Sequence, residues 1–242
     1  MSAPATAGSQ AGLDLFDRLE IDYEHAYVHN TFKAACIQSL IALLPAHATV
    51  LDVGCGTGRP VFALLADADL HVIGSDISPK MIELAKQRVK GEFVVADMLT
   101  YAPPEGTKVD AVVIMFSHLQ LSSWQDFYDM MRRYAALIAP GGYLVIGTMA
   151  ADTYATKASD YDATGTYCVD FLAPFMGYPL PTFFLSKKGM RNFVEGMGLE
   201  IVSEEEGAFQ PDYEKAEVEM QQYIIAKRPE GLKELGLPEP RP

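Results

Sequence analysis

The chain has 242 residues, 49% of them hydrophobic, and its formal net charge is −13. This length and apolar content predict a single α/β domain with a substantial core, and no apolar run reaches the roughly 18 residues that a membrane span requires. So acidic a surface repels phosphate backbones, which disfavours DNA or RNA as a partner.

The N-terminal region is predicted to begin as a disordered segment, residues 1–11, without the basic and apolar parts of a secretory signal. The cysteines are odd in number and lack metal-ligand spacing, so we expect free thiols in a reducing, cytoplasmic setting. From Leu13 to Tyr27, apolar residues recur at three- and four-residue steps, which predicts a helix. A second helix is expected over 31–44, where Pro45 ends it.

The centre of the chain is the stretch Val50–Pro60, in which a short apolar strand runs into a loop of small residues. Gly54, Gly56 and Gly58 allow a ligand to approach bare backbone. Pro60 suits the first position of a helix, whose N-terminus offers unpaired N–H groups. Strand, glycine loop and helix together form the first half of a βαβ unit.

Strands and helices alternate beyond this loop, as expected for a parallel sheet with helices on both faces. Strands are predicted over 71–75, 93–96, 111–115, 143–149 and 199–204, with a last one inside 217–228. Helices are predicted from 60 to 67, from a Ser78 cap, from a Ser123 cap to near 137, and from a Ser186 cap to 197.

Residues 150–185 interrupt the alternation with a long irregular insertion. Its many aromatic residues argue against disorder, so we interpret it as a cap that lines a substrate pocket. A loosely held tail, 229–242, is expected at the C-terminus.

Acidic residues mark three successive strands. Asp52 lies within the strand before the glycine loop, Asp76 ends the next strand, and Asp97 ends the third. Because the carboxyl ends of parallel strands meet at one edge of a sheet, we expect these acids to converge on a ligand there.

The order of five motifs resembles that of the class I S-adenosylmethionine-dependent methyltransferases, strongly over 45–150 and loosely over 185–228. The motifs are Leu51–Gly58, Asp76–Met81, Ala96–Met98, Val109–Val112 and Leu137–Gly142. The resemblance implies a Rossmann-like α/β fold, a sheet of seven strands in the order 3-2-1-4-5-7-6 with strand 7 antiparallel. It also implies one domain over 12–228 with an N-terminal helical lid over 12–44.

By this resemblance the cofactor is S-adenosyl-L-methionine, and the partner is a small, partly hydrophobic methyl acceptor. Asp76 should accept the ribose hydroxyls and Asp97 the adenine amino group, while Asp52 holds the loop amides or the cofactor ammonium. The other predicted cofactor contacts are Tyr23, Gly54, Cys55, Gly56, Gly58, Ile77, Met81, Met98, Phe116 and Ser117.

The predicted catalytic residues are His118, just beyond the fourth strand, and Tyr27, on the helical lid. A histidine at this place suits proton removal near neutral pH, although it also suits a hydrogen bond inside the adenosine pocket. For Tyr27 and Tyr23, packing in the core is the alternative. A hydroxyl acceptor needs a base whereas a neutral amine does not, so oxygen is the favoured methylated atom.

Other functions remain open. N- or S-methylation of a small metabolite is one, and a cofactor-binding protein of the same fold without methyl transfer is another. A nicotinamide oxidoreductase is disfavoured by the G-x-G-x-G spacing and by Asp97. No metal site and no membrane association are expected, and the chain is expected to be a monomer or a homodimer.

Overall fold

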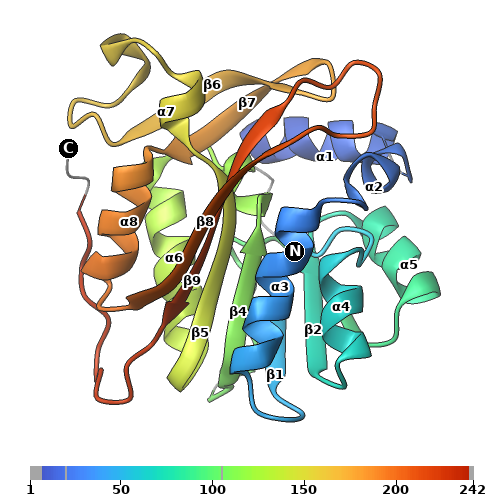
Figure 1. Ribbon diagram of the computed structural model, residues 1–242, viewed down its shortest axis with the longest axis vertical. Helices are drawn as coiled ribbons and strands as arrows, with labels where there is room; N and C mark the ends of the chain where they lie inside the picture. Colours follow the sequence, from blue (N-terminus) through green and yellow to red (C-terminus); the bar gives the residue numbers. More distant parts are fainter. Residues whose placement is uncertain (1–6, 20, 105, 240–242) are drawn as a thin grey trace.

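A seven-stranded sheet forms the middle layer of the structure, a computed structural model that describes residues 7–19, 21–104 and 106–239 (Figure 1). Its strands are β1 (Thr49–Val53), β2 (His71–Asp76), β3 (Glu92–Val95), β4 (Val109–Met115), β5 (Ile138–Met149), β8 (Glu200–Phe209) and β9 (Glu219–Lys227). Their order is β3-β2-β1-β4-β5-β9-β8, with β9 antiparallel to β5. Since β6 and β7 belong to a separate small sheet, this order confirms the predicted 3-2-1-4-5-7-6 arrangement.

Strand β1 lies at the centre and pairs in parallel with two neighbours. Val50 stands opposite Val72 of β2 and Ala111 of β4. The apolar residues of β1 are buried on both faces, as a strand between two helical layers requires. The loops after β1, β2, β3, β4 and β5 therefore leave the sheet at the same edge, which is the upper edge in Figure 1.

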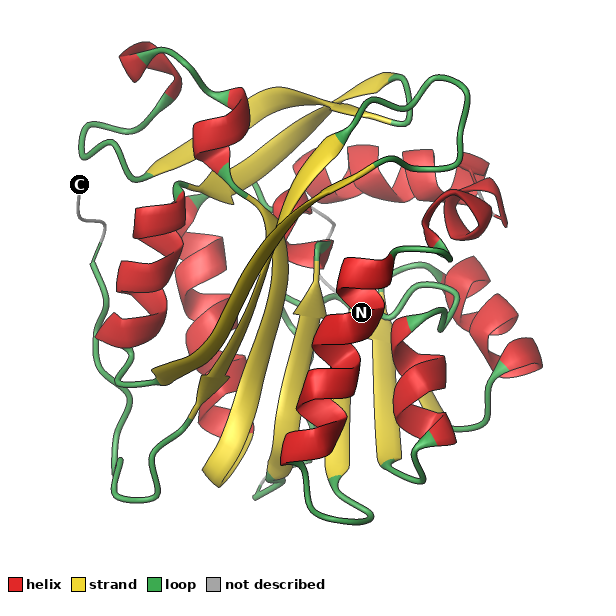
Figure 2. Ribbon diagram, in the orientation of Figure 1, coloured by secondary structure: helices red, strands yellow, loops and turns green. Residues whose placement is uncertain are grey.

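Helices cover both faces of the sheet (Figure 2). One face packs against α3 (Thr31–Leu43), α4 (Val61–Asp67) and α5 (Pro79–Arg88), and the other against α6 (Trp124–Leu137) and α8 (Lys187–Gly196). Successive residues of β1 face opposite layers. Val50 belongs to the core cluster that includes residues of α3 and α4, and Leu51 to the cluster that includes residues of α6 and α8.

Serine caps begin three of these helices, as the sequence predicts. The hydroxyl oxygens of Ser78, Ser123 and Ser186 accept hydrogen bonds from backbone N–H groups three residues on, at 3.2, 3.0 and 3.0 Å. Each cap satisfies a donor that the first helical turn leaves unpaired. The start of α5 is thereby fixed directly after β2, close to the site described below.

The carboxyl edge of the sheet is covered by segments from both halves of the chain. From the N-terminal half come α1 (Ala7–Leu19) and α2 (Ile21–Tyr27), and from the C-terminal half come α7 (Ala151–Tyr154), the 3-10 turn η2 (Ala158–Asp160), β6 (Tyr167–Phe175) and β7 (Tyr178–Leu185). Leu15, Leu19 and Tyr27 pack against Met176 and Leu180 of the β6–β7 hairpin, which joins the two halves.

Three sequence predictions need correction here. The disordered segment was expected to reach residue 11, but α1 begins at Ala7; residues 1–6 lie outside the described residues. The single helix expected from Leu13 to Tyr27 is two helices, α1 and α2. The insertion is not irregular throughout, because 167–185 forms a β-hairpin turning at Met176 and Gly177.

The C-terminal segment is also more ordered than predicted as far as Pro238. Gly236 N donates a hydrogen bond of 3.0 Å to Met197 O, and Pro238 lies against Gly196 at the end of α8. Residues 240–242 are outside the described part of the chain. The three cysteines are buried and unpaired, and none of the helices within the described ranges is long and apolar enough to cross a bilayer.

Candidate functional site

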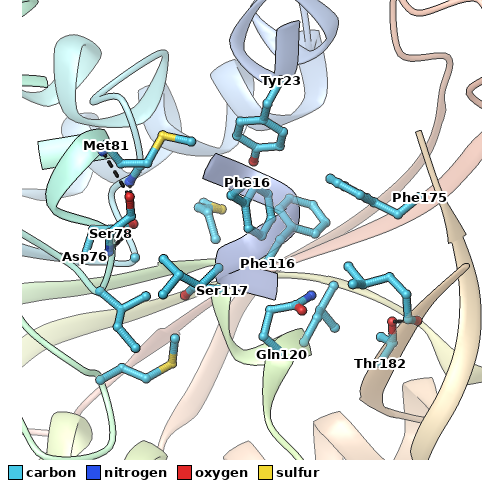
Figure 3. Close-up of a pocket in the computed structure, with 18 of the residues that line it drawn as sticks. Phe16, Tyr23, Asp76, Ser78, Met81, Phe116, Ser117, Gln120, Phe175 and Thr182 are labelled. Atoms are coloured by element: carbon cyan, nitrogen blue, oxygen red, sulfur yellow. Dashed lines mark hydrogen bonds between the residues drawn. The ribbon is translucent and has the colours of Figure 1, made fainter. Parts of the chain in front are cut away.

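A large pocket opens at the carboxyl edge of the sheet, beneath α1, α2 and the β6–β7 hairpin (Figure 3). It contains about 1210 Å³ of space, the open solvent at its mouth included. Loops after β1, β2 and β3 line one half, which we call the nucleoside half. Residues from η1 (Ser117–Gln120), β5, β6 and β7 line the other, which we call the acceptor half.

The glycine loop forms the floor between the two halves. Gly54 has φ +75°, and a Cβ there would lie 2.2 Å from Ser117 Cβ, so only glycine allows the loops after β1 and β4 to meet. Gly56 has φ +54°, and a Cβ on it would meet nothing within 4 Å. Bare backbone with open space in front of it is what close approach of a ligand requires.

Asp76 connects this loop to the start of α5. Its Oδ2 accepts a hydrogen bond from Gly56 N and its Oδ1 one from Ser78 N, both at 2.9 Å. Burial raises the pKa of the Asp76 carboxyl, and these backbone hydrogen bonds partly oppose the rise. Each carboxylate oxygen retains a lone pair, so the side chain can also accept from the two hydroxyls of a ribose.

The walls of the nucleoside half are apolar, with an acid at the far end. Ile77, Met81 and Met98 line the pocket, and Asp97 is held in place because its Oδ1 accepts from Leu99 N at 2.8 Å. Phe16 of α1 lines the same pocket (Figure 3). A flat apolar slot with one carboxylate suits an adenine ring and its amino group. These residues therefore fit an adenosine-containing cofactor.

Comparisons with known proteins agree with this geometry. Residues 50–142 match the family model described as a methyltransferase domain, and this range contains the glycine loop, Asp76 and Asp97. The fold matches the N-methyltransferase NodS of Bradyrhizobium japonicum WM9, solved with S-adenosyl-L-homocysteine, with a TM-score of 0.63 and 18% identity over 90% of this chain and 98% of that one. Residues 50–142 are thus similar to a methyltransferase domain, and the chain has the Rossmann-like methyltransferase fold.

Two curated proteins similar to this chain align with less than half of it. Phosphoethanolamine N-methyltransferase 1 of Arabidopsis thaliana is 34% identical over 102 residues, which is 40% of this chain and 20% of the relative. Trans-aconitate 2-methyltransferase of Methylobacterium radiotolerans is 32% identical over 111 residues, 44% of this chain and 41% of the relative. The alignments thus span less than half the length of either relative.

Most of the residues predicted for the site line this one pocket. They are Tyr23, Tyr27, Gly54, Gly56, Asp76, Ile77, Met81, Asp97, Met98, Phe116 and Ser117. The structure places Cys55 in the core cluster beneath α3 and α4, and a Cβ on Gly58 would face Ala85 and Val89. Neither is among the pocket-lining residues.

His118 also lies away from the pocket lining. Phe116 has a left-handed backbone conformation, with φ 65°, and the chain then turns through η1 into the interior. The buried His118 ring is 5.9 Å from that of Phe127, and its Nε2 is 3.1 Å from Thr148 Oγ1. Burial lowers the pKa of His118 to about 3. The structure thus gives a base role for His118 no support, and we do not propose it further.

Asp52 and Lys33 are two buried ionisable residues near enough to influence each other's charge. Asp52 is not a lining residue, and within the described ranges its Oδ2 has no hydrogen-bond partner. Burial, together with the nearby Asp76, raises the pKa of Asp52 to about 7. Lys33 of α3 lines the pocket, with its Nζ 5.1 Å from the Phe116 ring centroid and 5.4 Å from that of Tyr27. Burial lowers the pKa of Lys33 to about 8.

Lys33 was not predicted from the sequence. Its ammonium makes no hydrogen bond or ion pair with any described residue, although Glu219 and Asp52 are near enough to favour its charge. A buried cation without a paired anion is costly. Its location beside Phe116 and the glycine loop therefore makes it a candidate for binding an anionic group of a ligand.

Tyr27, which was predicted for the site, belongs to a buried hydrogen-bond network whose other members were not predicted. Tyr27 Oη donates to Glu219 Oε1, while Gln221 Nε2 donates to Glu219 Oε2 at 2.7 Å. Asn30 Nδ2 and the Tyr223 hydroxyl donate to Gln221 Oε1 at 2.6 and 2.5 Å. Burial raises the pKa of Glu219. Burial and the Glu219 charge raise the pKa of Tyr27 well above its ordinary value.

This network lies at the pocket, because Tyr27, Glu219 and Gln221 all line it. A carboxylate that accepts a hydrogen bond from a hydroxyl, as Glu219 does from Tyr27, can take up the hydroxyl proton during a reaction. No cluster of His, Cys, Asp and Glu able to hold a metal ion occurs in the part of the chain that the structure describes.

Proposed function

We propose that this chain transfers a methyl group from S-adenosylmethionine to an oxygen atom of a small, partly hydrophobic molecule. The observation that carries the proposal is the Tyr27–Glu219 pair, a proton-accepting group in a pocket that also fits an adenosine. The acceptor half, lined by residues of η1, β5, β6 and β7, is where the methyl acceptor would lie beside the cofactor.

The cofactor would be held mainly by the nucleoside half. Asp76 would accept from the ribose, Asp97 from the adenine amino group, and Gly56 would present its backbone to the ligand. Lys33 would bind the carboxylate of the methionine portion, and Asp52 behind the loop would balance the neighbouring ammonium. When bound, the cofactor supplies a methyl group activated by its positive sulfur.

The chain itself contributes alignment and proton acceptance. Tyr27 is too weak an acid to be ionised in this pocket, because burial and the Glu219 charge both raise its pKa. It would therefore take the acceptor's hydroxyl proton as it passes its own proton to Glu219. In this way the acceptor oxygen gains nucleophilic character while no free anion has to form in the apolar pocket.

The proposal is tested by product analysis. Purified chain would be incubated with S-adenosylmethionine and, separately, with panels of phenols, aliphatic alcohols, carboxylic acids, amines and thiols. We expect formation of S-adenosylhomocysteine with one of the oxygen panels, and saturable binding of S-adenosylhomocysteine but not of NADH. Turnover confined to amines would contradict oxygen as the methylated atom, as would turnover confined to thiols. Binding without turnover of any panel would favour a cofactor-binding protein.

Names of the relatives leave the methylated atom open. One relative is named as an N-methyltransferase and another as a trans-aconitate 2-methyltransferase. The preference for oxygen rests on the Tyr27–Glu219 pair, because a neutral amine would not need it.

A Lys33→Met variant tests the proposed carboxylate contact. We expect its affinity for S-adenosylhomocysteine to fall about 10-fold or more, because a charge-assisted hydrogen bond is lost. Affinity for 5′-methylthioadenosine, which lacks the amino acid portion, should stay within about twofold. Isothermal titration calorimetry measures both constants.

The pH dependence gives this prediction a second readout. Since only the protonated Lys33 binds a carboxylate, and its pKa lies near 8 without ligand, wild-type affinity for S-adenosylhomocysteine should fall as pH rises above 8. The Lys33→Met variant should lack that decline. An equal loss of affinity for both nucleosides would show that Lys33 supports the pocket without binding the carboxylate.

A further inference from the structure

The acceptor half of the pocket has an apolar lining with few polar groups. Within the described residues, Leu119, Met149, Pro174, Phe175 and Leu180 form its walls. The charged lining residues lie elsewhere: Asp76 and Asp97 in the nucleoside half, and Lys33 and Glu219 at the junction between the halves. A charged molecule in the acceptor half would lose its hydration without gaining an opposite charge there.

Gln120 is the exception among these walls. It is the last residue of η1, and Figure 3 shows its amide directed into the space between Phe116, Phe175 and Thr182. Its Oε1 is buried, and no described residue donates a hydrogen bond to it. A buried carbonyl oxygen without a partner is costly in an apolar pocket, and natural proteins rarely keep one without a reason.

Thr182 provides a comparison within the same half. Its hydroxyl lines the pocket too, but it donates a hydrogen bond of 2.9 Å to Leu180 O in its own strand. That hydroxyl's proton is therefore already used inside the protein. The Thr182 hydroxyl is thus bonded to the protein, whereas Gln120 Oε1 has no partner among the described residues.

We propose that Gln120 determines acceptor specificity by receiving a hydrogen bond from the methyl acceptor, and that the acceptor is an uncharged, largely apolar molecule bearing a hydroxyl or N–H group. This inference rests on the proposed function and narrows its substrate class. A molecule without a hydroxyl or N–H group would leave the buried Gln120 Oε1 without a hydrogen bond and would therefore bind more weakly.

The inference is tested with three probes of one shape and different polarity: naphthalene, 1-naphthol and 1-naphthoate. Each is titrated by its intrinsic fluorescence into protein saturated with S-adenosylhomocysteine. Wild type should bind 1-naphthol about fivefold or more tighter than naphthalene, because one hydrogen bond is gained. It should bind the charged 1-naphthoate more weakly than 1-naphthol.

Two variants locate the effect. Gln120→Met, which keeps the length of the side chain and removes its polar atoms, should bind 1-naphthol and naphthalene about equally. Thr182→Val should keep the wild-type preference, because the hydroxyl it removes bonds to the protein. Both variants should bind S-adenosylhomocysteine as wild type does, which shows that they fold.

Several results would overturn the inference while the proposed function stands. These are an unchanged preference in Gln120→Met, an equal loss of preference in Thr182→Val, tightest binding of 1-naphthoate, or no binding of any probe by wild type that binds S-adenosylhomocysteine. If wild type fails to bind S-adenosylhomocysteine, the proposed function itself fails.

Discussion

Replacing Glu219 with glutamine is expected to lower kcat by about 10²-fold or more on a hydroxyl acceptor, the usual scale of general-base catalysis. The carboxylate that receives the Tyr27 proton is then absent, whereas the size of the side chain is kept. Burial raises the pKa of Glu219, so wild-type turnover should be lost as pH falls through a pKa above 4.5, where this carboxylate becomes protonated. The variant should lack that acidic decline.

The control for this prediction is cofactor binding, which depends on the nucleoside half of the pocket. Affinity for S-adenosylhomocysteine should change by less than about threefold in Glu219→Gln, since the nucleoside contacts are intact. A Tyr27→Phe variant should show a similar fall in kcat, because the proton path passes through its hydroxyl. Near-normal kcat with the acidic decline retained would show that neither residue accepts the proton.

Replacing Asp76 with alanine is expected to weaken S-adenosylhomocysteine binding by about 10²-fold or more. Hydrogen bonds to charged groups contribute about 1.5–3 kcal/mol each, and the variant would lose those to the ribose. It would also release Gly56 N and Ser78 N, so the loop that faces the ligand loses its anchor. Calorimetric titration and the thermal midpoint of the ligand-free protein separate these two losses.

Asp110 supplies a matched control for Asp76. It lies near the start of β4, at the opposite edge of the sheet, and its Oδ2 accepts from Thr49 N at 2.8 Å. Asp110→Ala therefore removes a carboxylate that binds backbone without touching the pocket. It should lower the thermal midpoint and leave ligand affinity unchanged. Equal affinity losses in the two variants would mean that Asp76 acts through stability alone.

Local sequence signals predicted the nucleoside half well, because its parts are short and close in the chain. The glycine loop must follow β1, and the parallel order of β1, β2 and β3 brings Asp76 and Asp97 to the same edge. The same reasoning placed His118 beside the reacting methyl group, whereas the structure buries it outside the pocket lining. A left-handed residue at Phe116 redirects the chain after β4, and a single backbone angle of that kind leaves no periodic trace in the sequence.

Tyr27 was predicted for the site, but its pairing with Glu219 was not, for a different reason. Tyr27 and Glu219 are 192 positions apart, and their meeting depends on β9 inserting antiparallel beside β5. Lys33 and Glu219 did leave a signal, since Lys33 is the one charged residue of α3 and Glu219 is followed by seven uncharged residues in β9. A charged residue in such a segment is a candidate for lining a pocket rather than for lying on the surface.

The β6–β7 hairpin escaped prediction because prolines obscure its pattern. Pro174, Pro179 and Pro181 lie within the strands, and proline is tolerated there only because a two-stranded sheet consists of two edge strands. The turn itself is Met176-Gly177 with both residues at positive φ, and of the two only the glycine is typical of such a turn.

The hydrogen bond between Tyr27 and Glu219 joins the second helix of the chain to its final strand, and this has a consequence during synthesis. A nascent chain released from the ribosome only as far as β5 already carries the glycine loop, Asp76 and Asp97. It lacks Glu219, the carboxylate proposed to receive the proton, which arrives with β9. By the proposed mechanism, methyl transfer would therefore begin only once the last strand has paired with β5.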